Sequence, residues 1–232
     1  MIAARSPKII PYKYILYISM LFITIDLSAV SVAYKMVTLN NLFEINSAAT
    51  LIFPLTYCIG DIVTEVYGYN MAKALIWYSL LLQIIFGLLT TAVIHLPSPL
   101  FWSNDPAYNT VFGSILRFIF AGTIANFSSS IINIYIVSKL KIPFEGKLFW
   151  LRSILSTIVG GFIMVAIIMV GFVGKDINHL QIWIMFKSTF SLEILYAFAL
   201  ALPASLIAKF LKIHEAVDVY DTETNYNPFN FK

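Results

Sequence analysis

Six long apolar runs divide the chain and limit most strongly how it can fold. A helix needs about 20 mostly apolar residues to cross the hydrocarbon core of a bilayer. The runs are too long for membrane β-strands, and they lack the period-2 alternation of such strands. They cover Tyr14–Val37, Ala48–Tyr67, Ala72–His95, Ile115–Val137, Leu148–Phe172 and Ile182–Leu211. The sequence therefore predicts an all-α, polytopic integral membrane protein built as a bundle of six transmembrane helices.

The composition excludes several other classes of protein. Of the 232 residues, 59% are hydrophobic and only 12% are charged, whereas globular domains carry roughly 25% charged residues. Such a chain is neither a soluble domain nor disordered, and its partner is the lipid bilayer. The one cysteine, Cys58, allows no internal disulfide. The net charge of +3 is not gathered into a patch, so no nucleic-acid partner is expected.

The distribution of basic residues predicts the orientation. With both termini in the cytoplasm, 11 of the 15 lysines and arginines fall in inner segments and 3 in outer loops. Cytoplasmic loops carry this excess of positive charge in membrane proteins. We therefore expect an N-in/C-in topology with a cytoplasmic N-terminal segment (residues 1–13), a transmembrane domain (14–211) and a cytoplasmic tail (212–232).

The second apolar run carries an acidic stripe. Tyr57, Asp61 and Glu65 are spaced i, i+4 and i+8, which places them on one face of a helix. An ionisable side chain within a span costs roughly 2.5–3.5 kcal/mol on insertion scales, so the stripe should face the interior of the bundle. Pro54 removes a helical hydrogen bond and predicts a kink in this run.

The stripe has two interpretations. Carboxylate oxygens can accept parallel N–H donors of the kind that a guanine-like edge presents, and an aromatic ring can stack on a flat heterocycle. This favours a substrate-binding site. Alternatively, Asp61 and Glu65 form structural ion pairs with Lys73 or Arg152.

Further polar residues within the runs are candidates for the same site. Asp26 lies in the first run without an evident partner, and Arg117 either binds substrate or snorkels to the interface. Asn126 and Asn133 belong to a polar stretch that either lines a cavity or makes interhelical hydrogen bonds. The candidate substrate-binding residues are Asp61, Glu65, Tyr57, Thr56, Asn126, Asn133, Asp26 and Arg117.

No catalytic or metal-binding motif is present. The sequence has no glycine-rich phosphate loop, no His-Glu-x-x-His and no Gly-x-Ser-x-Gly. Its three histidines are scattered over span ends and loops. We expect neither an enzyme nor a bound cofactor or metal.

Three blocks of the sequence resemble one family of transporters. Residues 53–57, 61–62 and 65–69 closely resemble the signature of the queuosine precursor transporter family, also known as the vitamin uptake transporter family. The segment Trp150-Leu151-Arg152-Ser153 with Ser156-Thr157 is similar to the start of the family's fifth helix. Lys187 and Pro203 are placed like a lysine and a proline in its last helix. The resemblance runs from about residue 26 to 210.

The resemblance implies a function and a substrate. It implies a six-helix importer in the inner membrane for 7-deazaguanine bases such as preQ0, preQ1 or queuine, which feed tRNA modification. Asp61 and Glu65 match the acidic pair of the family. The chain departs from the family where a Gln and an Asp often stand three residues apart in the fourth and fifth helices. At those positions it has Ser130, Asn133, Gly161 and Met164.

Two other functions stay open from the sequence. The chain could be the substrate-binding membrane subunit of a multi-component vitamin or nucleobase importer, or a membrane enzyme or assembly factor. Uptake by the chain alone in liposomes distinguishes a transporter from such a subunit. Homo-oligomerisation also stays open.

Overall fold

The computed structural model of the chain describes residues 12–39, 43–45, 47–170 and 178–230. Its helices are α1 (Ile15–Val32), α2 (Pro54–Tyr67), α3 (Tyr69–Ile94), α4 (Asp105–Phe112), α5 (Ile115–Lys141), α6 (Phe149–Val170) and α7 (His179–Glu215). A 3-10 helix, η1 (Ala48–Leu51), precedes α2. The prediction of a helical, multi-pass membrane protein agrees with five stretches long and apolar enough to cross a bilayer: α1, α3, α4 with α5, α6 and α7.

The second apolar run differs from the expected full-length span. It divides into η1 and the 14-residue α2, which is about 21 Å long, against roughly 30 Å of hydrocarbon core. Pro54 occupies the first turn of α2, where proline loses no helical hydrogen bond. The predicted kink is therefore wrong, because Pro54 begins the helix.

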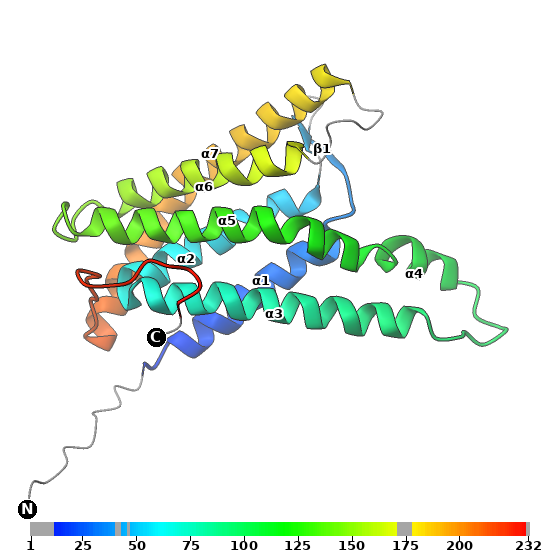
Figure 1. The fold of residues 1–232 in the computed structure, drawn as a ribbon, viewed down its shortest axis with the longest axis horizontal. Coiled ribbons are helices and arrows are strands. Elements are labelled where there is room, and N and C mark those ends of the chain that lie inside the picture. Colours follow the sequence, from blue (N-terminus) through cyan, green and yellow to red (C-terminus); the bar gives the residue numbers. More distant parts are fainter. Residues whose placement is uncertain (1–11, 40–42, 46, 171–177, 231–232) are drawn as a thin grey trace, which may run out of the picture.

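Helix α2 lies at the centre of the bundle. Twelve of its 14 residues are buried, and it packs against α1, α3, α5, α6 and α7 (Figure 1). The long helices instead expose large apolar side chains on their outer faces, such as Leu89 of α3, Phe162 of α6 and Leu206 of α7. Lipid can accept those side chains, so the polar stripe on α2 is shielded from the bilayer by its neighbours.

A single glycine joins α2 to α3. Gly68 has φ +86°, a conformation that side-chain-bearing residues rarely adopt. A Cβ atom there would lie 2.7 Å from the Val219 side chain. The chain therefore reverses direction in one residue, and the C-terminal segment packs directly on the turn.

A short β-hairpin follows α1. The first expected span is therefore too long at its end, because α1 stops at Val32 and Val37 begins a strand. Strands β1 (Val37–Leu39) and β2 (Phe43–Ile45) pair antiparallel, with Val37 opposite Ile45. Their residues are mostly β-branched or aromatic, the types that suit a pleated strand. Strand β2 packs against α7, and β1 lies at the end of the bundle opposite the C-terminus (Figure 1).

Both described ends of the chain lie at the same end of the bundle. The backbone N–H of Tyr14 donates to Glu215 Oε1 over 2.5 Å, and the α5–α6 connection lies at this end too (Figure 1). This arrangement is compatible with the predicted N-in/C-in topology, whose absolute orientation stays a prediction. Most of the expected N-terminal segment (residues 1–11) and the end of the fifth run at Phe172 lie outside the described residues.

The segment after α7 packs against the bundle. Helix α7 ends at Glu215, four residues beyond the expected span, and the chain then crosses the ends of α2 and α3 (Figure 1). Val219 N–H donates to the carbonyl of Val66 over 3.1 Å. Asp221 is buried, and its Oδ2 accepts the backbone N–H of Tyr69 (2.9 Å) and the hydroxyl of Ser138 (2.6 Å). Asp221 thus caps α3 from a distant part of the sequence.

Aromatic contacts fix the rest of this C-terminal segment. The Tyr226 ring lies 4.9 Å from the ring of Tyr69 and 5.1 Å from that of Tyr135. Trp77 Nε1 donates to the Pro228 carbonyl over 2.9 Å. Residues 216–230, which we call the C-terminal strap, are therefore an integral part of the fold.

Replacing Asp221 should destabilise the protein. Asp221→Ala removes the cap of α3 and leaves buried donors unpaired, which costs about 1–2 kcal/mol and lowers Tm by about 2–8 °C. Thermal unfolding of the detergent-solubilised protein measures the change. Glu223→Ala, an exposed position two residues on, is the matched control. Equal Tm values for the two variants would show that the strap does not stabilise the bundle.

Cysteine labelling tests the orientation. In a Cys58→Ser background, Asn104→Cys in the α3–α4 connection should react with a membrane-impermeant maleimide in intact cells. Lys147→Cys in the α5–α6 connection should react only after permeabilisation, because basic connections stay in the cytoplasm. Both positions are exposed. The reverse labelling pattern would invert the topology.

Candidate functional site

The predicted stripe on α2 faces the interior of the bundle. Tyr57, Asp61 and Glu65 are 2%, 0% and 1% exposed. Tyr57 donates its hydroxyl to Ser129 Oγ of α5 over 2.7 Å, and Asp61 Oδ2 accepts the hydroxyl of Ser153 of α6 over 2.5 Å. The spacing argument is confirmed, because all three side chains point away from lipid.

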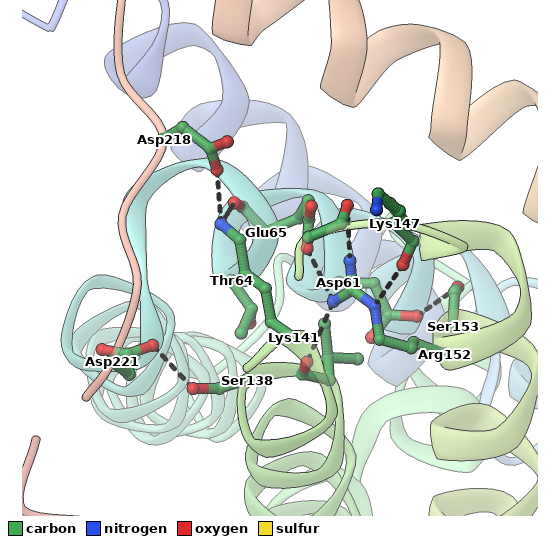
Figure 2. A network of polar contacts seen from close by, with 12 residues as sticks. Asp61, Thr64, Glu65, Ser138, Lys141, Lys147, Arg152, Ser153, Asp218 and Asp221 are labelled. Atoms are coloured by element: carbon green, nitrogen blue, oxygen red, sulfur yellow. Dashed lines mark hydrogen bonds and ion pairs between the residues drawn. The ribbon is translucent and has the colours of Figure 1, made fainter. Parts of the chain in front are cut away.

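Glu65 belongs to an ion-pair network at the end of the bundle that the strap covers. Its Oε2 accepts Arg152 Nη1 over 2.8 Å, and its Oε1 accepts Lys212 Nζ over 2.6 Å. Lys212 and Lys141 both pair with Asp218 of the strap, at 2.9 and 2.5 Å. Figure 2 shows the contact with Lys141. Both oxygens of Glu65 are thus paired with cations. Of the two interpretations of the stripe, the structural ion pair with Arg152 therefore holds for Glu65. Lys73 instead donates to a strap carbonyl.

The cations of this network are held by backbone carbonyls as well. Arg152, fully buried, donates to the carbonyls of Val137 (3.1 Å) and Lys147 (3.2 Å). Lys141 Nζ donates to the Glu65 carbonyl over 2.5 Å. Figure 2 shows these side chains converging from α2, α5, α6 and the strap. The network therefore joins α2, α5, α6, α7 and the strap.

Asp218 stays ionised throughout the neutral range. Burial alone raises its pKa, but the hydrogen bonds from Lys141 and Lys212 outweigh burial and leave the pKa below the ordinary aspartate value. A carboxyl whose pKa is lowered on folding stabilises the fold above its unfolded pKa. That contribution is lost only as the pH falls through the lowered pKa of the folded state.

A second group of polar side chains lies deeper between the helices. We call it the buried polar cluster; its members are Tyr57, Asp61, Ser129, Asn133, Ser153 and Glu193. Several of its atoms are buried without a hydrogen-bond partner: Asp61 Oδ1, both side-chain polar atoms of Asn133, and both carboxylate oxygens of Glu193. More than nine in ten buried polar groups in proteins are paired. Such a concentration of unpaired acceptors and donors indicates a site for a polar ligand.

The cluster is assembled from four helices. The Asn133 amide of α5 lies beside Asp61 of α2, and Tyr57 lies near both Asp61 and Glu193. Gly160 lets α6 approach α5: a Cβ atom there would lie 3.1 Å from the Ser129 carbonyl oxygen and 3.2 Å from Asn133 Cβ. Gly160 thus allows α5 and α6 to pack closely next to the cluster.

Glu193 of α7 is the site residue that the sequence analysis missed. It is fully buried, and a Cβ atom on Gly161 would lie 3.3 Å from Glu193 Cβ. Met164, the other departure from the family pattern in α6, places its Sδ 3.5 Å from the Tyr57 hydroxyl. The sequence contains a feature that could have identified it, because Glu193 is the only acidic residue inside the sixth apolar run.

Asp26 lies elsewhere in the bundle. It is 2% exposed, and its Oδ2 accepts the hydroxyl of Ser79 and, over 2.5 Å, the amide of Gln83, both from α3. The expectation that Asp26 avoids lipid is confirmed. Its partners are side chains of α3, however, and they satisfy it independently of the buried polar cluster.

Three other candidate residues are not brought into the cluster. The Thr56 hydroxyl donates to the carbonyl of Phe53 one turn back, over 2.7 Å. Asn126 is half-buried, and its side-chain oxygen accepts from Ser130 over 3.1 Å. Arg117 is exposed in the first turn of α5. Among the described residues no group of three or more His, Cys, Asp or Glu side chains could hold a metal ion.

The fold and the cluster define a class of protein: a multi-pass helical membrane protein with a polar site enclosed by its helices. The model of a family described as "Putative vitamin uptake transporter" matches residues 47–208, more than half of the chain. The chain therefore belongs to the vitamin uptake transporter family. That assignment agrees with a transport function rather than an enzymatic one. Neither the curated proteins nor the solved structures contained a match to this chain.

Glu65→Gln should destabilise the fold strongly. It leaves Arg152 buried without its counter-charge, and breaking a buried pair in this way costs about 3–5 kcal/mol. The same substitution at Glu145, whose pair with Lys147 is about three-quarters exposed, should cost at most about 1 kcal/mol. Thermal unfolding in detergent compares the two variants. Similar stability would mean that the network does not hold the bundle together.

Proposed function

We propose that this protein imports 7-deazaguanine bases, such as preQ0, preQ1 or queuine, across the inner membrane for tRNA modification. Membership of a family of vitamin uptake transporters supports import of a small molecule. The unpaired polar atoms of the buried polar cluster carry the proposal, because they indicate what a ligand must offer.

Asp61 is the main binding group in this proposal. One of its oxygens is held by Ser153, while Oδ1 is buried and unpaired. A guanine-like edge presents adjacent N–H donors that a carboxylate can accept together, and such charge-assisted hydrogen bonds are the stronger ones. The ring-nitrogen donor and amino group of the base would therefore point at Asp61.

Asn133 and Tyr57 complement that contact. The Asn133 side chain has both a free donor and a free acceptor, so it can meet the carbonyl of the base beside its N–H groups. The Tyr57 ring is buried against Phe53, with ring centroids 5.3 Å apart, and offers an aromatic surface to a flat heterocycle. Glu65 is assigned a positioning role, because both its oxygens are occupied.

A small cavity borders the proposed site. It lies between α2, α6 and α7 and is bordered by Ser153, the residue that holds Asp61; its other lining residues are Pro54, Cys58, Thr157, Tyr196, Ala197 and Leu200. Separation of these helices would extend the cavity to the cluster. The described conformation is thus closed around the proposed site.

Asp61→Asn should weaken binding of the base while leaving the protein folded. The change replaces an acceptor oxygen by a donor, and losing a hydrogen bond to a charged group costs about 1.5–3 kcal/mol, or roughly ten- to hundred-fold in Kd. Binding of preQ0 to purified protein measures the loss. Asp105→Asn, at the first residue of α4 and outside the cluster, is the matched control. Wild-type affinity in Asp61→Asn would remove Asp61 from the site.

Complementation tests the substrate class as a whole. Cells that lack both base synthesis and their own importer should regain queuosine in tRNA when they express this chain and receive preQ0, preQ1 or queuine. Reconstitution in liposomes tests whether the chain acts alone. Binding without uptake there would favour the substrate-binding subunit of a larger importer, and neither binding nor uptake would reject the proposal.

A further inference from the structure

We propose that Glu193 is the proton-carrying group of the transport cycle, so that one proton crosses the membrane with each base. The inference rests on the proposed import function and adds the coupling ion to it. It starts from the position of Glu193, the fifteenth residue of the 37-residue helix α7, well inside a membrane-spanning stretch.

Glu193 has no compensating charge in the described parts of the chain. It is 0% exposed, and neither carboxylate oxygen has a hydrogen-bond partner. The ion pairs of the described residues involve Glu65, Glu145 and Asp218, and none involves Glu193. A ligand or a proton must therefore supply what the protein does not.

The groups that face Glu193 do not favour an ionised carboxylate. From α6 it meets Gly161, which offers no polar side chain. From α2 the titratable neighbours are Tyr57 and, beyond it, Asp61, and neither side chain can supply a positive charge. On α7 itself, Lys187 is exposed and its ammonium group lies 5.1 Å from the ring centroid of Trp183. Lys187 lies six positions before Glu193 in the sequence, a spacing that places the two side chains on different faces of the helix.

Burial then decides the protonation state. An unpaired ionised carboxylate away from water is so costly that such groups take up a proton instead. Glu65 shows the opposite case in the same bundle, since Arg152 and Lys212 both donate to it. In the closed conformation, Glu193 therefore carries a proton as a neutral carboxylic acid.

Opening of the bundle would change that state. When helices separate toward one side, water reaches Glu193 and its carboxyl group exchanges a proton with that side, as COO⁻ + H₃O⁺ ⇌ COOH + H₂O. Protonation outside, closure, and release of the proton to water inside complete one crossing. Asp61 accepts a hydrogen bond from Ser153 in the described conformation, whereas Glu193 accepts none. In this proposal Asp61 therefore binds the base and Glu193 carries the proton.

Proteoliposomes containing the full chain separate coupling from binding. The probe is radiolabelled preQ0, measured as exchange without a gradient and as accumulation into an alkaline lumen. If one proton moves with each neutral base, a gradient of one pH unit supports about tenfold accumulation by the wild type. A pH-sensitive dye in the lumen should report acidification when preQ0 is added outside.

The variant Glu193→Gln should keep exchange and lose coupling. Gln is close in shape to a protonated Glu but cannot release a proton, so we expect exchange near the wild-type rate, no accumulation above equilibrium and no acidification. Glu145→Gln, at an exposed site, should behave like the wild type. Gradient-driven accumulation by Glu193→Gln, or accumulation by the wild type that follows a sodium gradient instead, would overturn the inference.

A spectroscopic measurement tests the proton on Glu193 without substrate. Infrared spectra at neutral pH should show the carbonyl stretch of a buried protonated carboxylic acid in the wild type and in Asp61→Asn, and its loss in Glu193→Gln. An unchanged spectrum in Glu193→Gln would show that Glu193 is ionised and would reject the inference. A wild type that neither binds nor moves preQ0 would reject the proposed function, and with it the coupling role, but it would leave the infrared result intact.

Discussion

The ion pair between Glu65 and Arg152 is the interaction on which the rest of the bundle depends. It links the central helix α2 to α6 through two side chains that are at most 1% exposed. Lys212 and Lys141 extend the pair to α7, α5 and the strap through Asp218. Because Glu65 and Arg152 are both buried, removing either one leaves the charge of the other uncompensated. Helix α2 is too short to be held by lipid alone, so this network and close packing fix its depth.

The buried acids of the bundle differ in what surrounds them, and their roles follow from that difference. Asp26 accepts hydrogen bonds from two α3 side chains through Oδ2, and both oxygens of Glu65 are paired with cations. Asp61 is half satisfied, and Glu193 has no partner. The first two stabilise the fold, while the second two retain unmet hydrogen-bonding capacity that a ligand or a proton can fill.

Gly161 of α6 leaves space that a side chain of another helix fills. Glu193 of α7 lies beside this glycine, so its carboxylate reaches the wall of the cluster from α7. Met164 borders the Tyr57 hydroxyl in the same region, so α6 lines the cluster with Gly161 and Met164 as well as with the polar Ser153.

The sequence by itself determined the helical membrane class, most span positions, and the inward orientation of Tyr57, Asp61, Glu65 and Asp26. These follow from apolar length, from the helical repeat and from the high free energy of charge in lipid, all of which act locally. Tertiary structure alone decided that Pro54 begins a short helix and that the strap caps α3. It also decided that Arg152 pairs with Glu65, while Glu193 has no cationic partner among the described residues. Those outcomes depend on which helix faces meet across the bundle. The two cations that pair with Glu65 lie 87 and 147 positions away from it in the sequence. Among the described residues, no distant side chain pairs with Glu193 in this way.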